Sequence, residues 1–227
     1  MNSIYFVSGI DTGIGKTVAT GLMALSLRKR GVDAITVKMV QTGNDGFSED
    51  IDAHRAIMGG FRFPEDDLGL TAPQIFKFPS SPLLAARLEE RAVDLDKISS
   101  AVAACAKRRD VVLVESAGGL DVPLTEDTLT ADFAASQGWP LILVTCGRLG
   151  AINHILLSLD AAKVRGIPVA GVVHNSHLSS DPRLDEDAVE STLRHLSRLG
   201  LPQTLVRIPT VAPSTPPPDI DFSEIFA

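Results

Sequence analysis

The sequence has no excess of basic residues and no long apolar run. Its 227 residues include 21 Lys and Arg against 28 Asp and Glu, a formal net charge of −7. A mildly acidic chain has no field that attracts a phosphate backbone or an anionic membrane, so we expect no general nucleic-acid binding. No apolar run reaches the roughly 18 residues that span a bilayer, and residues 1–8 lack the basic segment and cleavage-like site of a signal peptide. We therefore expect a cytoplasmic protein without a membrane segment.

Cysteine is scarce as well. Cys105 and Cys146 lie in separate apolar segments without metal-like spacing, so we expect two buried free thiols in a reducing compartment. No Gly-x-Ser-x-Gly nucleophile elbow occurs, and the histidines lack the spacing of a metalloprotease. We expect them at the surface or behind other site residues. The five are His54, His154, His174, His177 and His195.

Length and composition indicate one globular domain. At roughly 150 residues per domain the prior is a single unit, and the 44% hydrophobic and 22% charged shares are typical of folded proteins. We expect an α/β domain over residues 1–212 and a proline-rich tail over residues 213–227. Pro213, Pro216, Pro217 and Pro218 exclude helix and interior strand from the start of that tail. The tail is then either a loose terminus or a semi-rigid segment that crosses a ligand site.

Short apolar runs alternate with longer helix-like stretches along the chain. The runs are apolar throughout, which is typical of strands covered on both faces, so we expect a mainly parallel β-sheet with helices on both faces. Ligands of such sheets bind at the carboxyl ends of the strands. Residues 64–79 show no period and are expected to form an insertion or a connecting loop. Strands are predicted over residues 4–7, 34–39, 111–114, 141–145, 169–173 and 204–208, and helices over residues 17–30, 81–91, 94–107, 130–137, 152–165 and 185–199.

The strongest motif lies between the first predicted strand and the first predicted helix, in the segment Gly-Ile-Asp-Thr-Gly-Ile-Gly-Lys-Thr of residues 9–17. Gly13 and Gly15 allow backbone N–H groups to turn inward, where they and the helix N-terminus attract phosphate. Lys16 would neutralise β- and γ-phosphates, and the Thr17 hydroxyl would ligate Mg²⁺. Five residues separate Gly9 from the Gly-Lys-Thr ending, whereas the usual motif has four. The motif predicts nucleotide binding by a variant phosphate loop.

Further candidates stand at other strand ends, where a triphosphate would need cations and metal ligands. Lys38 ends the second apolar run and Glu115 the third. A lysine in an apolar run is costly unless it meets an anion, although it could also snorkel from an edge strand. Asp50 and Asp52 begin a helical stretch, so either could cap the helix or hold a metal. Asn175 could bind a nucleobase edge or form an Asx-turn.

Taken in order, these residues resemble the dethiobiotin synthetase family. The similarity runs from residue 5 to about residue 209, with little likeness over residues 60–78. The stations that carry it are the segment 9–17, Lys38 with Thr42-Gly43, Ser81-Pro82, Glu115 with Ala117-Gly118-Gly119, Gly150 with Asn153-His154, and Asn175.

The resemblance implies a P-loop NTPase architecture and the ATP-dependent closure of a ureido ring. In that reaction 7,8-diaminononanoate takes up CO₂ as a carbamate, ATP phosphorylates the carbamate, and the second amine closes the ring with loss of phosphate. The implied cofactors are ATP and Mg²⁺, and the implied assembly is a homodimer with sites at the subunit interface. The small-molecule substrates leave no role for nucleic acid or membrane.

Site residues follow from the resemblance position by position. The implied catalytic residues are Lys38, Lys16 and Thr12, and the implied metal ligands are Thr17, Asp52 and Glu115. Substrate contacts are implied for Thr42, Ser81, Gly150, Ala151, Ile152 and Asn153. Nucleotide contacts are implied for Gly13, Ile14, Gly15, Lys16, Thr17, Val18, Asp52, Glu115, Ser116, Ala117, Gly118, Asn175, Ile208, Pro209 and Thr210.

The sequence departs from the family pattern at several positions. Met39 stands where the family usually has proline, Ser116 replaces a glycine, and Leu83 replaces a common histidine. None of these departures removes a charge from the implied chemistry. They bear on the base preference and on the shape of the substrate cavity.

Two other kinds of P-loop protein are weighed against this reading. Amide-forming ligases of the cobyrinic acid diamide synthase type usually carry a glutamine amidotransferase domain, for which 227 residues leave no room. Partitioning-type ATPases normally place an extra lysine early in the phosphate loop, and here no lysine precedes Lys16.

Overall fold

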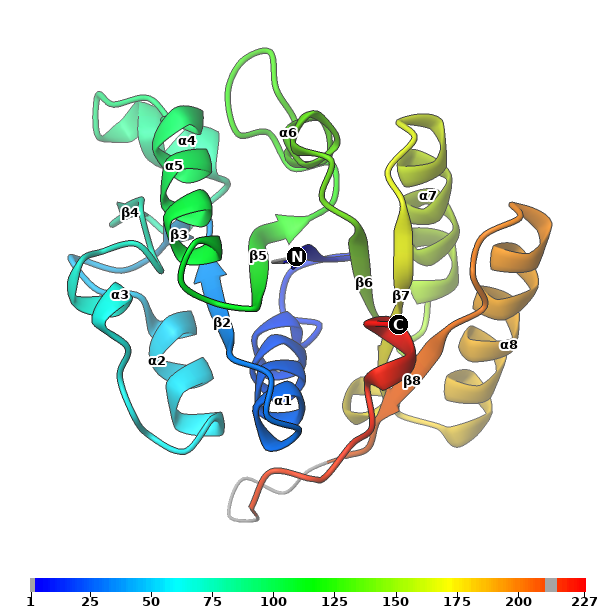
Figure 1. The fold of residues 1–227 in the computed structure, drawn as a ribbon. Coiled ribbons are helices and arrows are strands. Elements are labelled where there is room, and N and C mark those ends of the chain that lie inside the picture. The colour runs from blue at the N-terminus through cyan, green and yellow to red at the C-terminus, as the bar shows by residue number, and fades with distance from the viewer. Residues whose placement is uncertain (1–2, 211–215) are drawn as a thin grey trace.

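A six-stranded parallel sheet forms the centre of the molecule, in the order β2-β5-β1-β6-β7-β8. The computed structural model describes residues 3–210 and 216–227. Helices flank the sheet on both faces (Figure 1), which confirms the predicted architecture. The strands are β1 (Ser3–Gly9), β2 (Ala34–Lys38), β5 (Val111–Gly119), β6 (Leu141–Cys146), β7 (Val169–Asn175) and β8 (Leu205–Ile208).

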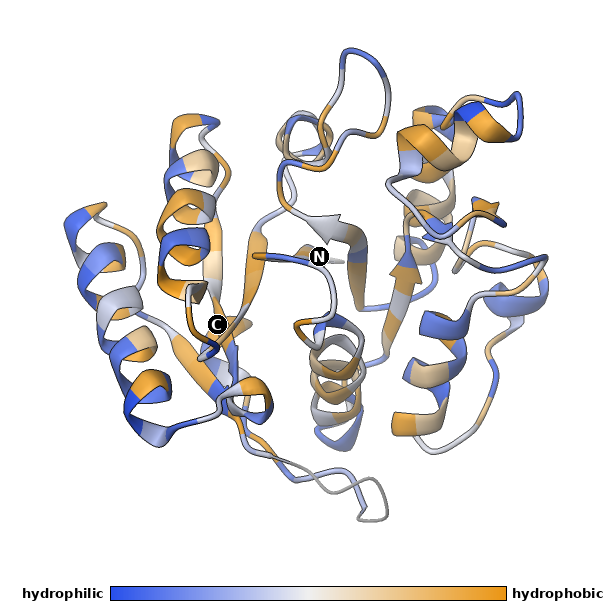
Figure 2. Ribbon diagram, turned by 180° about the vertical axis from the view of Figure 1, so that it is seen from behind, coloured by the Kyte–Doolittle hydropathy of each residue, from blue (hydrophilic) through white to orange (hydrophobic). Residues whose placement is uncertain are grey.

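The strands are buried because their side chains are apolar on both faces. Every residue of β2 and of β6 is buried, and Figure 2 shows largely apolar strands between helices in which apolar and polar residues alternate. Cys105 and Cys146 are buried free thiols, as predicted. Burial, the main cause, raises the pKa of the Cys105 thiol to about 11.

The six predicted helices form with small shifts at their ends, and two further helices lie between the first and the second of them. Ser48, Ser81 and Asp94 accept backbone N–H bonds at the starts of α2, α4 and α5. The helices are α1 (Lys16–Lys29), α2 (Glu49–Ile57), α3 (Pro64–Asp67), α4 (Pro82–Leu88), α5 (Leu95–Ala106), α6 (Thr130–Gln137), α7 (Ala151–Val164) and α8 (Pro182–Arg198), with short 3₁₀ turns η1 (Ser176–Leu178) and η2 (Ser223–Ile225).

Residues 64–79 are more structured than expected. They contain α3 and the short strand β4 (Ile75–Phe76), which pairs in parallel with β3 (Gln41–Thr42). The backbone N–H of Lys38 also donates a hydrogen bond to the carbonyl oxygen of Thr71 in this segment, at 2.7 Å. The segment therefore supports the chain that leaves the end of β2.

The described part of the tail, residues 216–227, differs from both expectations for it. Phe222 and Ile225 are buried in the main core, and the ring of Phe226 packs edge-on against Tyr5 at 5.0 Å between centroids. Ser26 of α1 donates a hydrogen bond to the Ile220 carbonyl oxygen at 2.8 Å. This segment is docked on α1 and beside β7, and it does not cross the cavity described below. Pro213 lies outside the described residues.

We expect Phe222→Ala to lower the free energy of unfolding by about 3 kcal/mol or more, because a fully buried ring leaves a cavity. Urea denaturation followed by circular dichroism measures the change. The matched control is Asp219→Ala, which removes an exposed ion pair with Lys29 and should cost less than about 1 kcal/mol. Equal, small losses in the two variants would contradict a stabilising role for the docked tail.

Candidate functional site

The predicted phosphate loop connects β1 to α1. Gly13 and Gly15 adopt left-handed conformations, with φ of 71° and 92°, that other residues rarely adopt. Gly15 is also the N-cap of α1, and no side chain caps that helix. The N–H groups at the start of α1 are therefore free to bind an anion.

Asn175 closes this loop from the end of β7. Its amide nitrogen donates to the Ile14 carbonyl oxygen at 3.0 Å, and its amide oxygen accepts the N–H of His177 at 3.1 Å. A Cβ on Gly15 would come within 2.3 Å of that amide nitrogen, so only glycine fits there. Of the two predicted roles, the structure has the Asx-turn, and the side chain braces the phosphate loop.

A buried histidine network holds the turn that carries Asn175. His174 lies between the Thr145 hydroxyl and the Asp185 carboxylate, at 2.9 Å from each, and Ser176 donates to the other Asp185 oxygen. Burial, the largest effect, lowers the pKa of His174. The neutral ring thus connects the ends of β6 and β7 to α8, a role behind the site as expected for the histidines.

Lys16 is buried at the first turn of α1, and its ammonium donates to the Asp11 carbonyl oxygen at 2.7 Å. Burial and the nearby Lys38 lower its pKa to about 8. A bound polyanion would relieve both effects, which fits the predicted role of this lysine.

Lys38 does not snorkel from its edge strand. It is 5% exposed, and its ammonium lies 2.7 Å from an Asp50 oxygen, 2.8 Å from a Glu115 oxygen and 2.9 Å from the Ser116 carbonyl oxygen. Burial alone would lower the pKa of Lys38, but the two carboxylates outweigh it and raise the pKa. The lysine is charged because two anions face it.

The register of the sheet creates this contact. Lys38 of β2 pairs with Glu115 of β5, and the next N–H, that of Met39, donates to the Glu115 carbonyl oxygen at 3.0 Å. A proline at position 39 has no N–H to donate. Met39 therefore extends the strand pairing at the point where the two charged residues meet.

Glu115 is fully buried, and both of its oxygens are engaged. One lies 2.8 Å from Lys38 and 3.2 Å from the Thr17 hydroxyl, and the other lies 2.9 Å from Nε2 of His54. Although burial raises its pKa, Lys38 and His54 hold the pKa of this carboxyl far below its usual range. Glu115 is therefore a carboxylate that accepts hydrogen bonds from Lys38 and His54.

Thr17, Asp50 and Glu115 bring a hydroxyl and two carboxylates together. The Thr17 hydroxyl donates to Asp50 at 2.6 Å, and its oxygen lies 3.2 Å from an oxygen of Glu115. No closed cage of three His, Cys, Asp or Glu ligands occurs in residues 3–210 or 216–227. Mg²⁺ in nucleotide sites is typically bound by few protein oxygens together with phosphate and water, so this donor set fits a magnesium ion.

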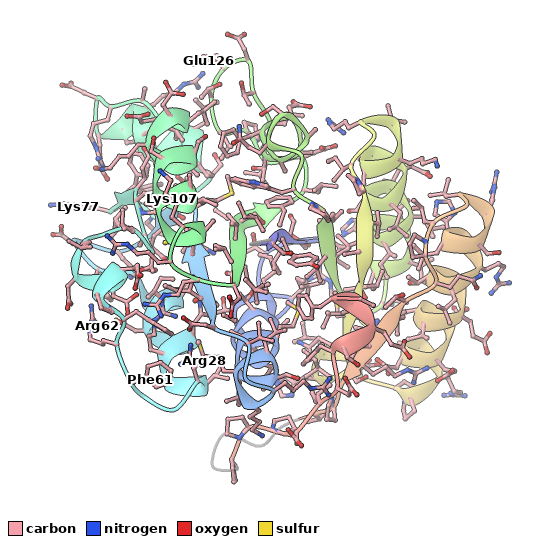
Figure 3. All side chains as sticks on the ribbon, viewed as in Figure 1. Arg28, Phe61, Arg62, Lys77, Lys107 and Glu126 are labelled. Atoms are coloured by element: carbon pink, nitrogen blue, oxygen red, sulfur yellow. The ribbon has the colours of Figure 1, made fainter. Side chains whose placement is uncertain are left out.

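Asp52, which the resemblance implies as a metal ligand, lies outside the cavity, and Asp50 lies in the site instead. Ser48 caps α2, so Asp50 lies in its first turn with its carboxylate toward Thr17 and Lys38. Two residues further is a rotation of about 200°. Asp52 consequently faces outward, 55% exposed and 3.6 Å from Arg62 at the molecular surface (Figure 3).

A cavity of about 820 Å³ joins the phosphate loop to the Lys38 cluster and to the segment before α4. Among the predicted residues that line it, Thr12, Thr42 and Ser81 come from three separate segments. The complete lining is Thr12, Gly13, Gly15, Lys16, Thr17, Val18, Lys38, Gln41, Thr42, Glu49, Asp50, Pro79, Ser80, Ser81, Pro82, Glu115, Ala117, Gly118 and Val122.

Other predicted residues lie outside this lining. Ile14 is fully buried, and the Ser116 hydroxyl donates to Ser8, so their side chains do not face the cavity. Ile208 lies beside Asn175 at the ends of β8 and β7, followed by exposed Pro209 and Thr210.

The start of α7, with Gly150, Ala151, Ile152 and Asn153, is also outside the cavity. It is joined to the phosphate loop by an ion pair between Arg148 and Asp11. A hydrogen bond from the Thr12 N–H and the Arg148 guanidinium together hold the pKa of Asp11 below its usual value. The loop before α7 thus fixes one side of the phosphate loop.

His54 lies behind Glu115, in line with the expectation for the histidines, although the sequence analysis named no partner for it. His54 stands four residues after Asp50, which places both on one face of α2. Once Ser48 is recognised as the cap, that spacing is the signal that would have identified the histidine.

Comparisons with known proteins find a family model and relatives that match most of the chain. A family model described as "AAA domain" matches residues 3–217. An ATP-dependent dethiobiotin synthetase of Pasteurella multocida is 41% identical over 92% of this chain and 97% of its own length. Another, from Chlorobaculum tepidum, is 47% identical over 86% of this chain and 81% of its own.

Solved structures show the same fold at low identity. A ParA family ATPase from Chlorobium tepidum matches with a TM-score of 0.53 and 16% identity, over 93% of this chain and 86% of that one. The pNOB8 ParA structure matches with a TM-score of 0.54 and 14% identity, over 90% and 79%. Among the described residues, no helix is long and apolar enough to span a membrane.

We expect Asp50→Asn to weaken Mn²⁺ binding in the presence of ADP by about tenfold or more, because it removes an anionic oxygen beside Thr17 and Glu115. Titration followed by electron paramagnetic resonance measures free Mn²⁺. Asp52→Asn, which removes the same charge two residues away, is the control and should bind Mn²⁺ as the unmodified protein does. The reverse order of the two affinities would refute the assignment of Asp50.

Proposed function

This chain belongs to the family of ATP-dependent dethiobiotin synthetases, and we propose that it closes the ureido ring of 7,8-diaminononanoate with CO₂. The members that it matches are ATP-dependent ligases, and so is this protein. The proposed products are dethiobiotin, ADP and phosphate, a step of biotin biosynthesis. The observation that carries the proposal is the convergence of two buried lysines, a hydroxyl and two carboxylates on one cavity.

The proposed reaction has three steps. An amine of the substrate attacks CO₂ to form a carbamate. A carbamate oxygen attacks the γ-phosphorus of ATP, ADP leaves, and a carbamic–phosphoric anhydride results. The second amine then attacks the carbonyl carbon, the carbon–oxygen bond to phosphate breaks, and the ring closes as phosphate and protons are released.

The two lysines would supply the positive charge for these changes. Lys16 and the uncapped N–H groups at the start of α1 would bind the β- and γ-phosphates. They lie where the phosphate loop runs into the helix, and a helix N-terminus attracts anions. Lys38 would stabilise the carbamate and the transferring phosphoryl group, and Thr12 also lines the cavity. Phosphoryl transfer depends mainly on such alignment and charge.

Thr17, Asp50 and Glu115 would hold Mg²⁺. When bound, the ion would supply further positive charge against the triphosphate.

The substrate would lie between the Lys38 cluster and the segment that leads into α4. Thr42 and Ser81 line this part of the cavity, and the Ser81 hydroxyl oxygen also caps α4. A side chain that caps a helix has a defined orientation, so Ser81 is suited to position a diamine chain. The segment that follows β8 would receive the base, with the exposed Pro209 and Thr210 at its edge.

We propose a homodimer in which the start of α7 completes the partner's site. The N–H groups that follow Gly150 have no side-chain cap, and they lie outside the cavity of their own chain. Leu157 and Val164 on one face of α7 are 59% and 85% exposed, with Leu149 at 83% before the helix. A second copy would cover these apolar groups and present the helix N-terminus to a substrate carboxylate. The proposed compartment is the cytoplasm.

The purified chain should convert 7,8-diaminononanoate, bicarbonate and MgATP to dethiobiotin. Mass spectrometry detects the product, and a coupled assay detects ADP. Omission of the diamine should abolish ADP release above background. ADP binding without any dethiobiotin would overturn the substrate assignment while leaving the nucleotide site intact.

Lys38→Met should lower kcat by about a hundredfold or more, because it removes a charge that acts on the transferring group while keeping the length of the side chain. Steady-state kinetics at saturating substrates measure the loss, and ADP titration verifies that the site is formed. The control is Lys107→Met, at the exposed end of α5 (Figure 3), which should keep full activity. A Lys38→Met enzyme within twofold of normal turnover would place Lys38 outside the reaction.

A further inference from the structure

His54 combines complete burial with an unusual position behind a charged site residue. It lies on α2, is 0% exposed, and holds one oxygen of Glu115 at 2.9 Å from its Nε2. Its other ring nitrogen, Nδ1, is the one buried side-chain N or O atom without a hydrogen-bond partner in residues 3–210 and 216–227. An unpartnered buried nitrogen costs free energy, so the ring occupies this position at the expense of stability. The contact of the other ring nitrogen, Nε2, with Glu115 offsets this cost.

The contact defines which nitrogen carries hydrogen. An ionised carboxylate only accepts hydrogen bonds, so Nε2 of His54 is the donor to Glu115. The donated bond occupies Oε2 and leaves Oε1 directed at Lys38 and the Thr17 hydroxyl. The histidine thereby determines which oxygen faces the cavity.

One helix supplies one carboxylate of the cluster and the side chain that holds the other. Asp50 and His54 lie one turn apart on α2, so the same face provides an acidic ligand and a brace for the second one. The helix packs on α1, which carries Thr17, and on β2, which carries Lys38. Packed secondary structure therefore places the Thr17 hydroxyl, the Asp50 carboxylate and the Glu115 oxygens relative to one another.

We propose that His54 is a positioning residue that holds Glu115 with a single oxygen toward the divalent cation bound with the nucleotide. Without the donor, Glu115 rotates freely about its terminal torsion and pairs both oxygens with Lys38. The cation then competes with a stronger lysine contact and binds more weakly. This proposal rests on the proposed function, because it assumes that a metal–nucleotide complex occupies the cavity.

The test compares a variant that lacks the donor with one that restores it. His54→Leu keeps a similar volume without an N–H group, whereas the amide of His54→Gln extends to about the position of Nε2. We expect His54→Leu to weaken Mn²⁺ binding in the presence of ADP by about tenfold or more, and His54→Gln to stay within about threefold of the unmodified protein. Electron paramagnetic resonance of free Mn²⁺ gives the affinities, and ADP binding without metal should be equal in all three.

The matched control is His195→Leu. His195 also pairs through Nε2 with a carboxylate, that of Asp160 at 2.8 Å, on α8 and away from the cavity. This variant should bind Mn²⁺ normally. Thermal melting verifies the fold of every variant, and His54→Asn, whose amide is too short to reach Glu115, replaces His54→Leu if the latter does not fold.

Normal Mn²⁺ binding by a folded His54→Leu, or by His54→Asn in its place, would overturn the proposal. Equal losses in the Leu and Gln variants would also overturn it, since a role in packing alone does not distinguish the donor. Failure of the unmodified protein to bind Mn²⁺ with ADP would do the same. Failure to produce dethiobiotin, with Mn²⁺ affinities that follow the expected order, would reject the substrate assignment and support the role of His54.

Discussion

The contact of the Lys38 ammonium with the Asp50 and Glu115 carboxylates is the interaction on which the site depends. A lone ammonium at this depth would be strongly disfavoured, and each carboxylate would be disfavoured without the lysine. The contact joins the end of β2, the end of β5 and the first turn of α2. Any error in the pairing of Lys38 with Glu115, or in the start of α2, would leave a buried charge without a partner. The fold and the charge pattern therefore specify each other at this point.

Much of the fold follows from the sequence because the relevant signals are local. The strands are apolar on both faces, which only a sheet covered on both sides explains, and the phosphate loop occupies the connection between β1 and α1 where the glycines allow it. Residues 64–79 were harder, because a four-residue helix and a two-residue strand are too short to produce a period. The docked tail also escaped prediction, since its apolar residues Ile220, Phe222 and Ile225 follow a group of prolines that indicates a loop.

The site was predicted less completely than the fold, because it depends on helix phase and on contacts across the sheet. Lys38, Lys16, Thr17 and Glu115 stand at strand or helix ends that the sequence marks, and they do converge. Asp50 and Asp52 have the same chemistry and differ only in direction, which the cap at Ser48 determines. The partners of Asn175 and His54 come from the phosphate loop and β5, far from them in sequence. Local patterns can place a residue on a helix face, but they do not reveal these distant partners.

The contact between Lys38 and its two carboxylates also affects how a dication would compete for those carboxylates. The ammonium is a tethered counterion, so its effective concentration at Asp50 and Glu115 does not fall when the protein is diluted. A dication that approaches these oxygens has to compete with a rival that cannot diffuse away. Phosphate oxygens of a bound nucleotide would give the ammonium another anion to pair with, so by linkage the nucleotide and a dication would strengthen each other's binding.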